Sequence, residues 1–198
     1  MINAGVWGYS SYQGRVLIEK ILEYRPDLVL ISFGSNDARP VQVPDSQYGV
    51  GSAWLARIRT WLAPFHLGQL ILGVSRQWIA RGSEAQAHRV GLPEYRQNLR
   101  EMVRLARARG STAVLLTRPY RGPISKRTTW KSFGPDYNAA TADVAEKLRA
   151  PLIDLYTHFK DRDTLFANDS HFTHEGHKMA AEIILRRLKP WIPIGEGC

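Results

Sequence analysis

The stretch Asp27-Leu-Val-Leu-Ile-Ser-Phe-Gly-Ser-Asn-Asp37 decides the fold, because it joins a continuous apolar run to a short polar turn. An apolar run bounded by Pro26 and Gly34 is typical of a strand buried on both faces of a parallel sheet. In open α/β sheets, ligands bind just beyond the carboxyl ends of such strands. Gly34 permits a sharp turn there, and the Asn36 amide can donate to a developing oxyanion. The stretch therefore predicts an α/β fold with a functional site at this turn.

Apolar runs and helical patterns alternate along the rest of the chain. Strands are predicted at 2–6, 27–33, 112–117 and 151–155, and helices between Ser10 and Pro26 and at 93–109, 135–149 and 174–188. Strands that alternate with helices form parallel βαβ units. The sequence thus predicts an α/β/α sandwich of three layers around a mainly parallel sheet.

Composition limits the classes of function that this chain can have. Its 198 residues, 44% hydrophobic and 23% charged, predict a single globular domain over residues 1–198. The net charge of +9 permits attraction to anionic partners, but no basic block interleaved with aromatics favours nucleic acid. Cys198 is the one cysteine and cannot form an internal disulfide. No run could span a bilayer and residues 1–5 do not resemble a signal peptide, so the sequence leaves localisation open.

Residues 38–92 are interpreted as an insertion between a strand and the next helix. Its first part is rich in Pro, Gly, Gln and Ser, whereas 54–80 carries apolar residues at helical spacing with several arginines. This amphipathic segment could be a lid over an acyl pocket, a helix on a membrane surface, or an ordinary helix packed on the sheet. The packed helix is favoured, because amphipathic helices usually face a protein core.

A second motif lies near the end of the chain, where Asp169 precedes His171 by two residues and Thr173 can cap the following helix. A histidine acting as general base needs a partner that fixes its tautomer and supports its positive charge. His174 and His177 follow at steps of three residues, which does not match the i, i+4 spacing of a helical zinc site. The motif therefore predicts acid–base chemistry and no metal.

Three segments in this order resemble the blocks of the SGNH hydrolases, also called the GDSL-type esterase/lipase family. Residues 3–14 are similar to the second block, 34–37 to the third, and Asp169 with His171 to the fifth. The resemblance implies a flavodoxin-like sheet and a serine mechanism that cleaves an acyl or acetyl ester without a cofactor. The implied substrate is a small-molecule or glycan ester.

The resemblance also assigns roles to individual residues. His171 would be the general base and Asp169 its orienting carboxylate, although Asn168 holds the position that the family usually gives to this carboxylate. The Gly8 N–H and the Asn36 side chain would form the oxyanion hole. Gly34, Arg118 and Tyr120 would lie at the substrate loop, where the basic residues could form a rim for an anionic or sugar substrate or a merely solvated loop.

The first block, Gly-Asp-Ser with the nucleophilic serine, occurs nowhere in the 198 residues. We therefore expect the sheet to lack its first strand, the nucleophile to lie upstream of Met1, and the chain as given to have little activity. Two alternatives stay open: an O-acyltransferase of the same fold, and a catalytically inactive binding protein. The oligomeric state cannot be predicted from the sequence.

Overall fold

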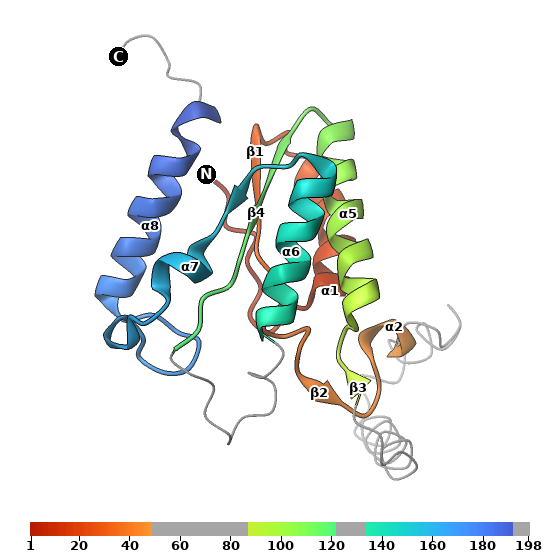
Figure 1. Ribbon diagram of the computed structural model, residues 1–198. Helices are drawn as coiled ribbons and strands as arrows, with labels where there is room; N and C mark the ends of the chain where they lie inside the picture. The colour runs from red at the N-terminus through yellow and green to blue at the C-terminus, as the bar shows by residue number, and fades with distance from the viewer. Residues whose placement is uncertain (49–86, 122–133, 192–198) are drawn as a thin grey trace, which may run out of the picture.

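A computed structural model describes residues 1–48, 87–121 and 134–191 (Figure 1). In chain order the elements are α1 (Ser11–Leu22), β1 (Leu28–Ile31), β2 (Pro40–Val41), α2 (Asp45–Tyr48), β3 (Ala87–His88), α5 (Leu92–Ala108), β4 (Thr112–Leu116), α6 (Gly134–Leu148), β5 (Leu152–Ile153), α7 (Leu155–Phe159), η2 (Asp163–Leu165), α8 (His174–Leu188) and η3 (Lys189–Trp191).

The main sheet has the strand order β1-β4-β5, and both strand pairs are parallel. Leu28 of β1 is aligned with Thr112 of β4, and Leu115 of β4 with Leu152 of β5. This topology confirms the predicted α/β class with a parallel sheet. A separate antiparallel pair joins β2 to β3.

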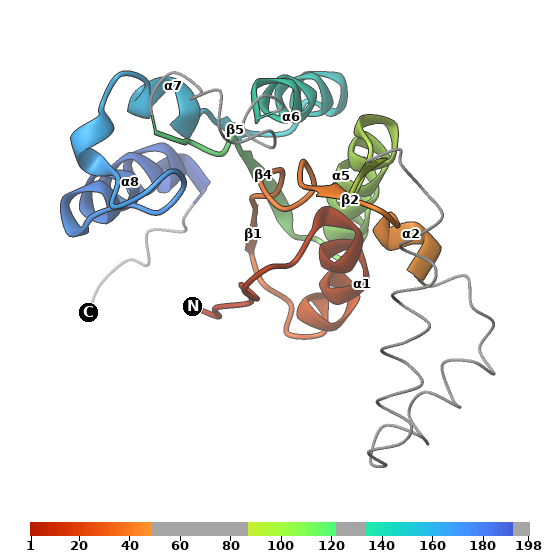
Figure 2. The same cartoon turned by 90° about the horizontal axis from the view of Figure 1, so that it is seen from below.

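Helices cover the two faces of the main sheet, and Figure 2 shows α1, α5 and α6 on one side and α7 and α8 on the other. The central strand β4 contributes alternate residues to the two cores. Ala113 and Leu115 pack with α1, α5 and α6, whereas Val114 and Leu116 pack with α7 and α8. Because side chains of a strand alternate between its faces, a continuous apolar run such as β4 requires helices on both sides.

Strand β1 lies at the edge of the main sheet within the described residues. Its Leu30, on the same face as Val114, is 45% exposed, whereas Val114 is fully buried. The prediction of a strand at 2–6 is wrong, since these residues form no regular structure. A strand is stable only when a neighbour pairs its backbone groups, and residues 2–6 pair with no described strand.

Local capping signals set the helix starts that position the site. Ser10 and Gln13 form the predicted capping box at α1, in which the Ser10 N–H donates to Gln13 Oε1 at 3.0 Å. Thr173 caps α8 by accepting from the Gly176 N–H at 3.2 Å. These short-range contacts explain why both helix starts could be predicted from sequence.

The structure describes only the two ends of the predicted insertion. Its first end contains β2 and α2, and its last end contains β3. The amphipathic segment 54–80 lies outside the described residues, so its role stays a prediction. Among the described helices, none has the length and apolar character needed to cross a membrane.

Candidate active site

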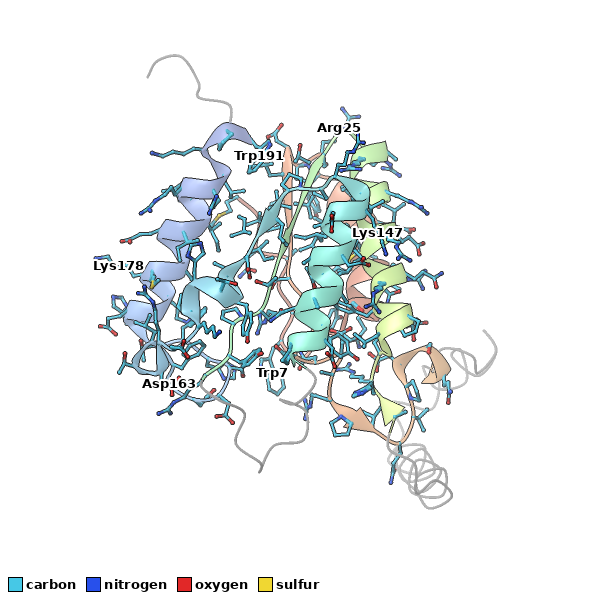
Figure 3. The ribbon with its side chains drawn as sticks, viewed as in Figure 1. Trp7, Arg25, Lys147, Asp163, Lys178 and Trp191 are labelled. Carbon is cyan, nitrogen blue, oxygen red and sulfur yellow. The ribbon has the colours of Figure 1, made fainter. Side chains whose placement is uncertain are left out.

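Chain turns that carry the predicted site residues gather at one end of the sheet. Strands β1, β4 and β5 are parallel, so their carboxyl ends share one edge, and the amino-terminal ends of α1 and α8 face the same edge (Figure 1). In Figure 3, Trp7, next to Gly8 in the chain, and Asp163 of η2 also lie at this end. The arrangement matches the crevice in which open α/β sheets bind ligands.

The turn after β1 is fixed by a buried carboxylate. Asp37 is fully buried and accepts from the Gly34 N–H at 3.0 Å and from the Ser11 N–H at 2.8 Å. Burial raises the pKa of Asp37, against hydrogen bonds from Ser11 and Gly34 that lower it. Asp37 thereby ties the turn to the start of α1.

The backbone conformation of Gly34 and the close packing around its Cα both favour glycine at this position. Its φ is +123°, and a Cβ would lie 3.3 Å from Tyr137 Cβ and 3.5 Å from Tyr95 Oη. The Tyr95 hydroxyl in turn donates to the Phe33 carbonyl at 3.1 Å. The buried side chains of Tyr95 and Tyr137 therefore pack against the turn and limit its movement.

The structure brings Asn36 next to the segment that contains Gly8. Asn36 Nδ2 donates to the Tyr9 carbonyl at 3.0 Å. One amide N–H is used in this bond, and the other remains for a ligand. Gly8 itself has a φ of +78°, so the segment turns sharply at this residue. The two predicted oxyanion donors thus lie on segments that are directly hydrogen-bonded to each other.

Arg89 holds the Gly8 segment from the other side, and sequence reasoning missed it. Its Nη1 donates to the Gly8 carbonyl at 2.6 Å, its Nη2 to Gln13 Oε1 at 2.9 Å, and its Nε to Asp45 Oδ1 at 2.8 Å. Ser10 Oγ donates to the same Asp45 carboxylate. No spacing rule could have indicated Arg89, because its partners are distant in sequence and it stands in the region taken as an insertion.

We expect Arg89→Ala to destabilise the fold by on the order of 3 kcal/mol, since it leaves the Asp45 carboxylate, whose side chain is only 11% exposed, without its cation. Urea unfolding of the variant measures this loss. In a double-mutant cycle, Arg89→Ala with Asp45→Ala should cost less than the sum of the single changes. Additive effects would show that Arg89 and Asp45 do not stabilise the fold as a pair.

The predicted base, His171, is exposed just before α8. Its Nδ1 lies 2.8 Å from Asn168 Oδ1, which also accepts from the backbone N–H groups of His171 at 3.1 Å and Ser170 at 3.2 Å. Because an amide oxygen can only accept, Nδ1 carries the proton and Nε2 is free to act as a base.

Asn168, the alternative to Asp169 in the sequence, is therefore the residue that contacts the imidazole. The Asp169 carbonyl accepts from the Arg121 N–H at 3.0 Å, which ties this loop to the one after β4. The role of the Asp169 carboxylate stays a prediction. A neutral amide fixes the tautomer but supports an imidazolium less than a carboxylate would.

Serines near the site are already engaged. Ser10 Oγ donates to Asp45, the fully buried Ser11 Oγ accepts from Asn98 Nδ2 at 3.1 Å, and Ser35 Oγ accepts from Arg118 Nε at 3.3 Å. Within the residues that the structure describes, no three His, Cys, Asp or Glu side chains form a group that could hold a metal ion. The roles of His171 as a base and of Gly8 and Asn36 as oxyanion donors stay predictions, and among the described residues the contacts assign no nucleophile.

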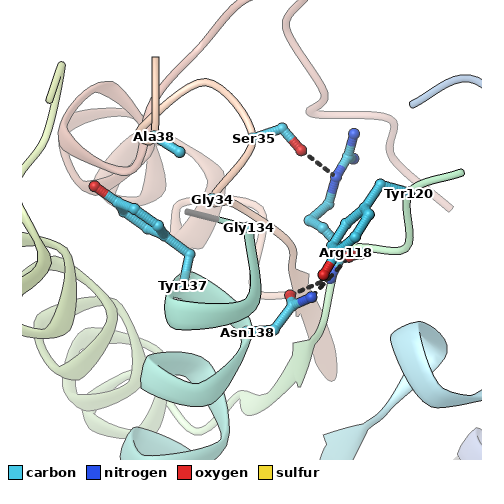
Figure 4. A pocket seen from close by; sticks show the side chains of 8 residues that line it. All are labelled: Gly34, Ser35, Ala38, Arg118, Tyr120, Gly134, Tyr137 and Asn138. Atoms are coloured by element: carbon cyan, nitrogen blue, oxygen red, sulfur yellow. Dashed lines mark hydrogen bonds between the residues drawn. The ribbon is translucent and has the colours of Figure 1, made fainter. Parts of the chain in front are cut away.

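The predicted substrate-loop residues line a small pocket beside the turn after β1 (Figure 4). Gly34, Arg118 and Tyr120 all contribute to its wall, and Arg118 extends toward Ser35 of the turn. The pocket is lined by Gly34, Ser35, Ala38, Arg118, Tyr120, Gly134, Tyr137 and Asn138.

Comparison with known proteins identifies the family of the chain. Residues 1–179 match the GDSL-like Lipase/Acylhydrolase family, and the chain belongs to that family. No curated protein matches the sequence significantly.

Several solved structures share the fold at low identity. A lipase/acylhydrolase from Enterococcus faecalis is 18% identical with a TM-score of 0.62, over 96% of this chain and 75% of that one. The acetylxylan esterase Axe2 from Geobacillus stearothermophilus is 19% identical with a TM-score of 0.63, over 98% of this chain and 74% of that one. A GDSL-like lipase from Bacteroides thetaiotaomicron is 15% identical with a TM-score of 0.59, over 93% of this chain and 73% of that one. These likenesses support an α/β fold of the SGNH-hydrolase type and, with the family, an ester hydrolase.

Proposed function

We propose that this protein is a serine ester hydrolase that removes acyl or acetyl groups, with a carbohydrate ester as the favoured substrate. The observation that carries the proposal is the His171–Asn168 pair at the same sheet edge as the hydrogen-bonded Asn36 and Gly8 segments. Membership of the GDSL-like family gives the reaction class, and the likeness to an acetylxylan esterase favours a sugar ester.

In the proposed mechanism, a serine hydroxyl attacks the ester carbonyl while His171 Nε2 takes its proton. The negative charge that develops on the carbonyl oxygen is stabilised by the remaining Asn36 N–H and the Gly8 N–H. His171 then gives its proton to the leaving alcohol, and water repeats the sequence to release the acid. Asn168 holds the imidazole throughout, and Asp169 supplies negative charge on the adjacent residue.

The nucleophile is proposed to be a serine of a Gly-Asp-Ser motif encoded upstream of Met1. Two observations support this: the motif is missing from the sequence, and β1 has an unpaired edge within the described residues, where a further parallel strand could add. Ser10, Ser11 and Ser35 each hold structural hydrogen bonds, which makes them poor substitutes.

Reaction with a fluorophosphonate, read by intact mass and peptide mapping, tests the proposal. We expect no adduct on the 198-residue chain and a stoichiometric adduct on a form extended upstream in its reading frame. An adduct on a serine of the 198-residue chain would overturn the assignment of the nucleophile. An extended form that neither reacts nor hydrolyses 4-nitrophenyl acetate would overturn the esterase and favour a binding protein.

A further inference from the structure

Arg118 presents a guanidinium beside the turn after β1, and no described acid is its partner. It follows β4, the central strand of the sheet, and its Nε donates to Ser35 Oγ at 3.3 Å. Among the described residues, the Arg118 side chain forms no ion pair. The nearest polar contact is thus a neutral hydroxyl, and the positive charge is left uncompensated.

The position of Arg118 is nevertheless fixed by a dedicated contact. Asn138 of α6, which is 7% exposed, accepts from the Arg118 N–H at 2.8 Å and donates to the Arg118 carbonyl at 2.9 Å. One amide side chain therefore satisfies both backbone groups of this residue. Because the clamp involves only the backbone of Arg118, its side chain is free to be changed without loss of the clamp.

Burial makes this charge unfavourable in the free protein. Desolvation lowers the pKa of Arg118, and Tyr95 is the group that opposes this shift. An arginine still keeps its proton at neutral pH, so a partly desolvated charge without a counter-ion costs stability. Such a cost is offset when an anion binds, which explains the placement of the side chain.

Aromatic rings form part of the pocket wall beside Arg118. Tyr120 and Tyr137 provide aromatic walls, and a Cβ on Gly134 would lie 3.0 Å from Tyr120 Cε1, so glycine leaves room for the ring. Two described acids lie near these rings, but neither forms an ion pair with Arg118. Asp37 accepts from backbone N–H groups, and Asp136 is exposed on α6. Among the described residues that line the pocket, Arg118 is the one cation.

We propose that Arg118 binds a carboxylate carried by the ester substrate, so that the site prefers acidic esters over neutral ones. The planar guanidinium matches a carboxylate in a two-bond geometry, and a single cation balances its single charge. A phosphate, with its greater charge, would call for further cations. That the bound carboxylate belongs to the substrate rests on the proposed esterase function, whereas the binding of a carboxylate does not.

Binding to the 198-residue chain tests the inference without any turnover. Monomethyl succinate should bind, as measured by titration in heteronuclear NMR, at least tenfold more tightly than neutral dimethyl succinate. Arg118→Gln should lose this difference, whereas Arg121→Gln, which removes the same charge from an exposed position in the same loop, should keep it. Equal binding of the two succinates, or tighter binding of methyl phosphate, would overturn the proposal.

Thermal unfolding separates a ligand-binding residue from a structural one. Because Arg118→Gln removes an uncompensated charge and spares the Asn138 clamp, its Tm should equal or exceed that of the wild type. Arg118→Lys, which keeps the charge but not the planar fork, should fold equally well and bind monomethyl succinate more weakly. A lower Tm in both variants would show that the guanidinium serves the fold and would overturn the inference.

Turnover by the form that carries the reactive serine distinguishes this inference from the proposed function. Arg118→Gln should raise KM for an acidic acetyl ester at least tenfold more than it raises KM for 4-nitrophenyl acetate. Hydrolysis of both esters with no effect of Arg118→Gln would retain the esterase and reject the carboxylate site. Arg118-dependent binding of monomethyl succinate without hydrolysis of any ester would retain the site and reject the esterase.

Discussion

His171→Ala is expected to lower kcat/KM for ester hydrolysis by about 10³–10⁴-fold, in whichever form of the protein carries the reactive serine. The change removes the Nε2 that takes the serine proton in the proposed mechanism, and this loss corresponds to about 4–5.5 kcal/mol of transition-state stabilisation. Initial rates with 4-nitrophenyl acetate measure the effect. Fluorophosphonate labelling should slow in parallel, since both reactions need the activated serine.

His174→Ala is the matched control, because His174 is also an exposed histidine at the start of α8. It should leave the rate within about twofold, as surface changes away from the reacting atoms usually do. Asn168→Ala should reduce the rate by roughly 10²-fold, because the imidazole loses the acceptor that fixes its tautomer. If Asp169→Ala were far more damaging than Asn168→Ala, the carboxylate and not the amide would be the partner of His171.

Gly176→Ala is expected to destabilise the fold by about 3 kcal/mol or more. A Cβ at this position would lie 2.2 Å from the Leu165 carbonyl oxygen, and backbone cannot move aside as a flexible side chain can. The first turn of α8 would have to shift away from η2. At roughly 2–4 °C of Tm for each kcal/mol in a domain of this size, Tm should fall by about 6 °C or more.

Gly91→Ala is the comparison for this glycine effect. A Cβ added at Gly91 would lie 3.9 Å from Pro93 Cδ, which is an ordinary van der Waals contact. The free energy of unfolding of this variant should therefore differ from that of the wild type by less than about 1 kcal/mol. Gly176→Ala should also reduce activity beyond its loss of folded protein, because the start of α8 positions His171. A Tm for Gly176→Ala equal to that for Gly91→Ala would contradict the close packing of α8 on η2.

Much of the fold follows from local patterns in the sequence. The apolar run before Gly34 formed β1, the Ser10 and Gln13 pair capped α1, and Thr173 capped α8. Each of these depends on residues within a few positions of one another, so spacing alone carries the information. The failed strand at 2–6 shows the limit, because a strand also needs a partner from elsewhere in the chain.

The sequence by itself determined the α/β class, the turn that carries Asn36 and the histidine motif before α8. Only the tertiary structure showed that Asn168 Oδ1 lies within hydrogen-bond distance of the His171 imidazole, because the backbone path of a loop sets which side chains meet. Only the structure joined Arg89 to Gly8 and Arg118 to Ser35. These contacts link residues far apart in the chain, and such pairings arise from the packing of strands and helices, which no local spacing records.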